Sequence, residues 1–158
     1  MKVQDLTLTD ELRDIVQIGI ITDDIERTKK GMLEVFGLEP DAGGYSVYKK
    51  SVYRDGKVID AEVVSAFYNF FNIQLEFLQP TGEDDTIWSD YLKMGQNGLH
   101  HIRFDVTDND VVTKLMAEKG IAVWMEGTSL IDPTARFTYY DSLDKLGSVS
   151  YTHLRAHE

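Results

Sequence analysis

The residues of this chain with the clearest capacity for chemistry are an imidazole, a carboxylate and an amide on three separate segments. His101, Glu76 and Gln17 supply one nitrogen donor and two kinds of oxygen donor. This mixture suits a divalent ion of intermediate hardness, such as Co²⁺, Mn²⁺, Ni²⁺ or Zn²⁺. The same residue types also line polar clefts and solvated strands, where they bind no metal. Because the chain has no cysteine, thiolate nucleophiles and thiolate metal sites are excluded.

The elements that carry these residues have the composition of β-strands. Three segments show strand length and β-branched or alternating patterns, namely residues 15–22, 73–79 and 99–106. Since successive side chains of a strand point to opposite faces, His101 should lie on a polar face and His100 on the apolar face that packs against helices. The same alternation places Gln17 and Glu76 on the face of His101. We therefore predict that Gln17, Glu76 and His101 converge on one surface.

One structural unit occurs twice along the chain. After the strand at 15–22, Asp23 and Glu26 form an Asp-x-x-Glu capping box for a helix that ends at Gly37. The pattern recurs after the strand at 99–106, with Asp108 as the helix cap and Gly120 as the stop. Further strands are expected at residues 45–53 and 62–70 in the first half, and at 121–126 and 136–141 in the second.

Aligning Gln17 with His101 brings the two halves into register, which indicates an internal repeat. We predict one domain over residues 1–147, with a first module at 14–80 and a second at 98–147. The linker at 81–97 should contain a short amphipathic helix around Trp88.

The last residues differ abruptly from what precedes them. Residues 149–158, VSYTHLRAHE, match the translation of a transposon-end adapter used in shotgun sequencing, and Ser148 fits the adjoining adapter bases. We therefore expect residues 148–158 to be a non-native tail outside the fold. The alternative is a natural C-terminal strand, since Val-Ser-Tyr-Thr has β propensity. His153 and His157 lie in this tail, which leaves His100 and His101 as native candidates.

The charge balance narrows the classes of partner. Acidic residues outnumber basic ones by 27 to 16, for a net charge of −11. Nucleic acid and anionic membrane surfaces are therefore poor partners. No apolar run approaches the roughly 18–20 residues of a membrane span, and the first residues do not form the apolar core of a signal peptide. The default expectation is a cytoplasmic protein.

Two motifs resemble the vicinal oxygen chelate superfamily of glyoxalases, bleomycin resistance proteins and dioxygenases. The first is GLHHIRFDV at 98–106, and the second is QLEFLQPTGEDDTI at 74–87. The second motif, which runs into a short helix, most resembles the methylmalonyl-CoA epimerases. The resemblance implies an α+β fold in which paired βαβββ modules form a curved mixed sheet around a metal cup.

The resemblance also implies a set of metal ligands on the first and last strands of each module. The matching positions are Gln17, Glu76, His101 and Tyr151. Gln17 stands where the epimerases usually have histidine, and Tyr151 stands where they usually have glutamate. If residues 148–158 are non-native, the natural chain should carry glutamate at this last position. With Tyr151 there, we expect weakened metal binding and low epimerase activity.

The activity implied by the resemblance is epimerisation of an acyl-CoA thioester through removal of the proton α to its carbonyl. A divalent ion would stabilise the enolate, with Glu76 as a ligand and as the candidate catalytic residue. The base that removes the proton is not assigned, and Glu62 is only a weak candidate for it. Positive charge for the CoA phosphates would come from Lys49, Lys50, Arg103 and Arg136.

Two other functions stay open at this stage. A non-catalytic module that binds small molecules, as in antibiotic sequestration, is favoured by Gln17 and by many aromatic residues: Tyr45, Tyr48, Tyr53, Tyr68, Trp124 and Tyr140. The common role of such aromatics is sheet packing. The other alternative is a glyoxalase-type lyase or a ring-cleaving dioxygenase, and Gln17 argues against the two-histidine iron site of the latter. A homodimer is possible, because the two modules could pair within one chain or between two.

Overall fold

Two βαβββ units follow one another in the computed structural model, which describes residues 7–96 and 98–154. The first unit contains β1 (Ile15–Ile21), α2 (Ile25–Phe36), β2 (Ala42–Tyr53), β3 (Lys57–Asn69) and β4 (Gln74–Thr81). The second contains β5 (Gly98–Val106), α4 (Asn109–Glu118), β6 (Val123–Thr128), β7 (Arg136–Tyr140) and β8 (Val149–Leu154). Shorter elements connect them: α1 (Leu8–Glu11), η2 (Arg54–Gly56), α3 (Ile87–Lys93) and α5 (Leu143–Leu146). The α+β class and the paired modules predicted from the sequence are confirmed.

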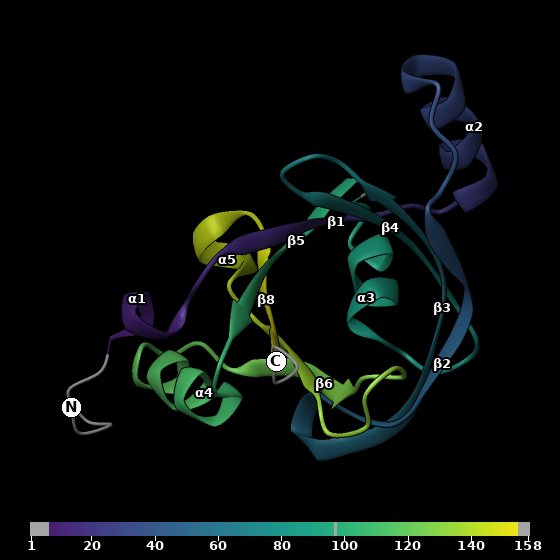
Figure 1. Cartoon of the computed structure of the whole chain (residues 1–158). Coiled ribbons are helices and arrows are strands. Elements are labelled where there is room, and N and C mark those ends of the chain that lie inside the picture. Colours follow the sequence, from purple (N-terminus) through teal and green to yellow (C-terminus); the bar gives the residue numbers. More distant parts are fainter. Residues whose placement is uncertain (1–6, 97, 155–158) are drawn as a thin grey trace.

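The strands of the described residues close into one barrel, in the order β1-β4-β3-β2-β6-β7-β8-β5 (Figure 1). Each unit contributes one parallel pair, β1 with β4 and β5 with β8. The units are joined by antiparallel pairing of β1 with β5 and of β2 with β6. The two modules therefore pair within a single chain, and the first strands of both lie side by side at one seam.

Helices α2 and α4 lie outside the ring of strands (Figure 1). The inner face of α2 packs Ile25 and Met32 against Phe77 of β4, and that of α4 packs Val112 and Met116 against Tyr140 of β7. These contacts use the outward face of each strand, which leaves the alternate side chains to fill the barrel. No helix among the described residues is long and apolar enough to cross a membrane.

The helix caps follow the predicted repeat, with one correction. Asp24, and not the predicted Asp23, caps α2 by accepting a hydrogen bond from the backbone nitrogen of Arg27 at 3.1 Å. Only Asp23 matches the Asp-x-x-Glu spacing, but Asp24 is the residue that directly precedes the first helical turn. Asp23 instead forms a surface ion pair with the Arg27 side chain. The predicted cap of α4 is confirmed, because Asp108 accepts from two backbone nitrogens of the first turn.

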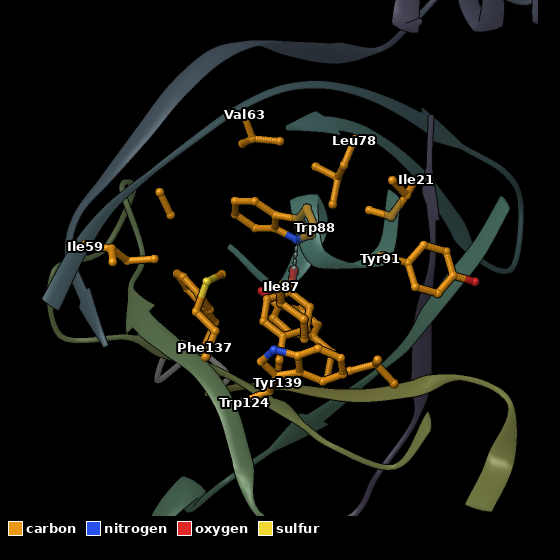
Figure 2. Close-up of a cluster of buried hydrophobic side chains, with 14 residues drawn as sticks. Ile21, Ile59, Val63, Leu78, Ile87, Trp88, Tyr91, Trp124, Phe137 and Tyr139 are labelled. Carbon is orange, nitrogen blue, oxygen red and sulfur yellow. Dashed lines mark hydrogen bonds between the residues drawn. The ribbon is translucent and has the colours of Figure 1, made fainter. Parts of the chain in front are cut away.

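The interior of the barrel is aromatic. Helix α3 lies inside the outline of the ring of strands in Figure 1, and its residues Trp88 and Tyr91 belong to the same buried cluster as Phe137 and Tyr139 of β7. Figure 2 shows Trp88 directed toward Tyr139, and its Nε1 donates to the tyrosine hydroxyl oxygen at 3.2 Å. The linker between the modules therefore supplies a side chain that fills the centre of the barrel.

Strand β8 corrects the expectation that residues 148–158 lie outside the fold. Val149–Leu154 pair with β5 on one side and with β7 on the other, and Val149 and Thr152 are fully buried. The β propensity of this segment, together with two edges that need a partner, accounts for its place in the sheet. The non-native origin of residues 148–158 stays a prediction, and residues 155–158 lie outside the described part of the chain.

Candidate functional site

The two parallel strand pairs carry equivalent positions. Glu76 of β4 lies two residues beyond the partner of Gln17 in β1, and Tyr151 of β8 lies two residues beyond the partner of His101 in β5. Since β1 and β5 pair directly, the four side chains reach the barrel interior from adjacent strands. Gln17 and His101 thus occupy equivalent positions in the two units, as do Glu76 and Tyr151, and all four lie around one centre.

The structure brings Gln17, Glu76 and His101 together. The Nε2 atom of His101 lies 3.2 Å from Gln17 Oε1 and 3.3 Å from Glu76 Oε1. His101 is fully buried, Gln17 is 2% exposed, and the Glu76 side chain is 12% exposed. The convergence follows from strand alternation, as predicted, whereas the role of these residues as ligands stays a prediction.

These separations fit one metal ion. Two donors that each lie about 2.1 Å from an ion are about 3.0 Å apart at a right angle and about 3.4 Å apart at a tetrahedral angle. The two distances from His101 Nε2 fall within this interval. The described residues contain no cluster of three His, Cys, Asp or Glu that could hold a metal ion, so the amide oxygen of Gln17 would have to serve as the third donor.

Tyr151 does not complete this donor set. Its ring stacks against Tyr139, with centroids 4.4 Å apart, and lies 5.1 Å from the ring of His101. Burial holds the pKa of the Tyr151 phenol well above its usual value, while the charge of Arg103 opposes this shift and that of Glu76 adds to it. A phenol that keeps its proton is a poor metal ligand. Tyr151 therefore does not join Gln17, Glu76 and His101 as a candidate donor.

A directed chain of hydrogen bonds runs through the site to the protein surface. Gln17 Nε2 donates to Gln74 Oε1 at 2.6 Å, and Gln74 Nε2 donates to Asn69 Oδ1 at 2.8 Å. With its amide nitrogen used in this way, Gln17 turns its oxygen toward His101. The chain thus orients the one neutral donor oxygen of the site.

His100 lies inside the barrel, and not against an outer helix as predicted. Its Nδ1 is 2.9 Å from Nδ1 of His101, and its ring packs edge-on against Tyr91 at 4.9 Å. The register between β1 and β5 shifts between Gly19 and Ile20, which pair with His101 and Leu99 and leave His100 between them. Such a bulge turns two consecutive side chains toward one side of a sheet. Simple alternation cannot predict this arrangement.

The cavity beside the site is small and mainly aromatic. Its volume is about 20 Å³, and its lining combines one carboxylate with apolar and aromatic groups: Tyr48, Glu76, Leu78, Trp88, Phe137, Tyr139 and Tyr151. This space holds about one water molecule or one ion. Sequence reasoning missed Trp88, Phe137 and Tyr139 as lining residues, although the short apolar helix at 87–92 and the alternation of 136–140 carried the relevant signal.

Other sequence candidates lie away from the cavity. Glu62 is on the outward face of β3, where its Oε1 accepts from the Tyr45 hydroxyl at 2.6 Å, so it is not placed to act as the base. Tyr68 and Tyr140 pack toward α2 and α4. Of the aromatic residues put forward as ligand contacts, Tyr48 alone lines the cavity among the described residues.

The basic candidates for CoA phosphates either pair with acidic residues or are exposed on a strand. Arg103 pairs with Asp105 at 3.1 Å, and Arg136 pairs with Glu126 at 2.9 Å. Lys49 and Lys50 are exposed on β2.

Comparisons with known proteins agree with this fold. Residues 16–139 match the Glyoxalase/Bleomycin resistance protein/Dioxygenase superfamily. A comparison with curated proteins found no match. Among solved structures, a methylmalonyl-CoA epimerase of Streptomyces coelicolor in complex with 2-nitronate-propionyl-CoA superposes with a TM-score of 0.65 at 20% identity, covering 92% of this chain and 96% of that one.

Two further solved structures resemble this chain. The methylmalonyl-CoA epimerase of Mycobacterium tuberculosis gives a TM-score of 0.61 at 14% identity, over 99% of this chain and 97% of that one. A hypothetical protein from Bacillus halodurans gives a TM-score of 0.68 at 14% identity, over 92% and 96%. At such identities the likeness shows a shared fold.

Proposed function

Because the chain belongs to the Glyoxalase/Bleomycin resistance protein/Dioxygenase superfamily, we propose that it is an isomerase of the methylmalonyl-CoA epimerase type. Its site would hold a divalent ion through Gln17, Glu76 and His101. Its substrate would be an acyl-CoA thioester with an acidic α carbon. The observation that carries this proposal is the position of His101 Nε2, which lies 3.2 Å from Gln17 Oε1 and 3.3 Å from Glu76 Oε1 inside the barrel.

The chemistry that the metal ion would supply is stabilisation of negative charge on the thioester oxygen as the α proton leaves. The protein residues fix the donor geometry: the hydrogen bond from Gln17 to Gln74 turns the Gln17 oxygen inward, and Gly19 leaves room for the His101 ring. The surrounding rings exclude water, which strengthens electrostatic interactions within the site.

Epimerisation also requires one group that removes the α proton and one that returns a proton to the opposite face. Glu76 is the one carboxylate in the cavity lining of the described residues. Tyr48, Tyr139 and Tyr151 line the same space, and burial raises the pKa of each phenol, to about 12 for Tyr48. Neutral phenols can donate a proton but cannot remove one near neutral pH. If Glu76 serves as a ligand, the site lacks a base, and we expect low activity.

The small size of the cavity also limits substrate binding. Ligand pockets usually measure several hundred Å³, whereas the space beside Glu76 is about 20 Å³. The ring of Tyr151, stacked on Tyr139, occupies the region between β8 and the site. An acyl group would enter only after one of these rings moves. A smaller residue at position 151 would enlarge the cavity. An acidic residue there would also add a metal donor.

The aromatic lining favours a second candidate, a binding module without catalysis. Five of the seven lining residues are aromatic, and His101 contacts two of their rings. Such a surface suits stacking of a flat ligand. The small cavity volume argues against this function as strongly as against catalysis, because a stacked ligand also needs one of the rings to move.

Two measurements on the purified chain separate these functions. The metal content is determined by elemental analysis after incubation with Mn²⁺, Co²⁺, Ni²⁺ or Zn²⁺ and removal of excess ion. Exchange of the α proton of methylmalonyl-CoA is followed by mass spectrometry in D₂O, which detects proton abstraction even without net turnover. The epimerase proposal expects one bound ion per chain and slow exchange that is lost in Glu76→Gln. A chain that stays free of metal and gives no exchange would support the binding module instead.

A further inference from the structure

Two adjacent imidazoles share one hydrogen bond in the barrel interior. His100 and His101 are both fully buried, and their Nδ1 atoms are 2.9 Å apart. A neutral imidazole has one N–H and one lone pair, so one of these two nitrogens must donate and the other must accept. The neighbours of the remaining ring nitrogens decide which one donates.

The surroundings of His101 Nε2 determine which imidazole donates in the hydrogen bond between the two Nδ1 atoms. This Nε2 atom faces two oxygens, one from the Glu76 carboxylate and one from Gln17, whose amide nitrogen already donates to Gln74. Both oxygens can only accept, so Nε2 of His101 carries the proton. In a neutral His101 ring the Nδ1 atom is then an acceptor, and Nδ1 of His100 must donate to it.

The surroundings of His100 agree with this assignment. His100 is fully buried, and a charged ring without a counter-ion is unfavourable there, so we take this ring as neutral. With its single proton on Nδ1, His100 presents a lone pair at Nε2, and this atom has no hydrogen-bond partner among the described residues. The opposite assignment would bury an unpaired N–H there and would also turn a lone pair of His101 toward two oxygens, which is unfavourable.

A metal ion at this site would reverse both assignments. Coordination uses the lone pair of Nε2, so the His101 proton must lie on Nδ1, where it would oppose the Nδ1 proton of His100 at 2.9 Å. The His100 proton must then lie on Nε2. The two rings together carry two N–H protons both without and with the metal ion. We propose that His100 is a positioning residue that determines which nitrogen of His101 is free for a metal ion. The metal-bound half of this inference rests on the proposed function, and the metal-free half does not.

The first test is ¹⁵N NMR of the chain with labelled histidine rings, at about pH 7.5 and above the ordinary imidazole pKa. Without metal we expect His100 to be protonated at Nδ1 and His101 at Nε2. With saturating Zn²⁺ we expect His100 to be protonated at Nε2 and His101 at Nδ1. A His101 ring protonated at Nδ1 in the metal-free protein would overturn the proposal. So would Zn²⁺ binding at His101 with an unchanged His100 ring. If Zn²⁺ does not bind, the proposed metal site fails, and the metal-free spectrum still decides the assignment.

The second test separates positioning from packing with two reciprocal variants. His100→Phe keeps a ring beside Tyr91 and Tyr139 but has no hydrogen-bonding atom. His100→Asn loses the ring but places an amide oxygen or nitrogen near the position of Nδ1. Loss of an outer partner typically weakens metal binding 10–100-fold. We therefore expect a Zn²⁺ dissociation constant about 10–100-fold higher in His100→Phe and within about threefold of the parent in His100→Asn. The reverse ranking would assign His100 a packing role alone.

Discussion

Gly19 lies directly opposite His101 across the β1–β5 ladder, and a Cβ atom on Gly19 would fall 1.9 Å from Cε1 of the His101 ring. This close approach leaves no room for any other residue at position 19 while the imidazole keeps its place. The geometry of the site therefore depends on a glycine that itself offers no donor atom.

Replacement of Gly19 by alanine should displace the His101 ring and destroy the three-donor arrangement. We expect Gly19→Ala to lose about 1–3 kcal/mol of unfolding free energy through overpacking, and to weaken Zn²⁺ binding at least about tenfold. Urea denaturation and a Zn²⁺ titration measure the two effects. Gly31→Ala is the matched control, because Gly31 lies within α2 and a Cβ atom added there would meet no atom within 4 Å. Equal metal binding by both variants would show that the His101 ring does not hold the ion.

Replacement of Tyr151 by glutamate should add the missing donor and enlarge the cavity. We expect Tyr151→Glu to raise Zn²⁺ affinity at least about tenfold and to increase α-proton exchange. Without metal the variant should melt at a lower temperature, because it buries an unpaired carboxylate in place of a packed ring. Tyr151→Phe is the control, since it keeps the ring and adds no donor. Identical metal affinities for the glutamate and phenylalanine variants would argue against position 151 as a ligand.

The partly buried phenol of Tyr48 should make the stability of the fold sensitive to alkali. Burial, followed by the charge of Glu76, raises the pKa of Tyr48 to about 12 from an ordinary value of 10.0. Above pH 10 the unfolded chain releases this proton while the folded chain retains it, so the stability contribution is present below pH 10 and is lost as the pH rises toward 12. The slope should reach at most about 1.4 kcal/mol per pH unit for this residue.

Urea denaturation at several pH values between 9 and 12 checks this dependence on the parent chain and on Tyr48→Phe. The variant should show a shallower loss of stability in that interval, since it has one buried ionisable group fewer. Superimposable curves for the two proteins would mean that Tyr48 ionises as readily in the folded chain as in the unfolded one.

Strand β8 should be essential for folding. Deletion of residues 149–158 would expose the edges of β5 and β7 and remove the buried side chains of Val149, Tyr151 and Thr152. Unpaired strand edges promote aggregation. We expect the shortened chain to elute as aggregates in size-exclusion chromatography and to show no cooperative thermal transition. A monomeric, cooperatively folding product would restore the prediction that the domain ends at residue 147.

The sequence predicted the modules well because their signals are local. The apolar periodicity of 25–36, the aspartate caps and the stop glycines define helices without reference to the rest of the fold. The predicted strands are all present, although β2 and β3 begin earlier than expected, at Ala42 and Lys57. Alternation also brought Gln17, Glu76 and His101 to one face, and the parallel pairing of β1 with β4 is unbroken from Gln17 to Ile21.

The sequence could not predict features that depend on distant contacts. The bulge that turns His100 inward appears only in the pairing of β5 with β1. Trp88 fills the barrel because α3 folds into it, a placement that the helix pattern alone does not define. The inclusion of Val149–Leu154 follows from two strands that each need a partner, which is a property of the closed sheet.

One divalent ion bound between Gln17, Glu76 and His101 is the feature on which the proposed activity depends. Anomalous diffraction from crystals soaked in Mn²⁺ or Zn²⁺ tests this site most directly. We predict a single strong peak within about 2.0–2.3 Å of Gln17 Oε1, Glu76 Oε1 and His101 Nε2, and no such peak in crystals of Glu76→Gln. A saturating soak of the unchanged chain that leaves this position without anomalous density, while ions bind elsewhere, would contradict the proposed site.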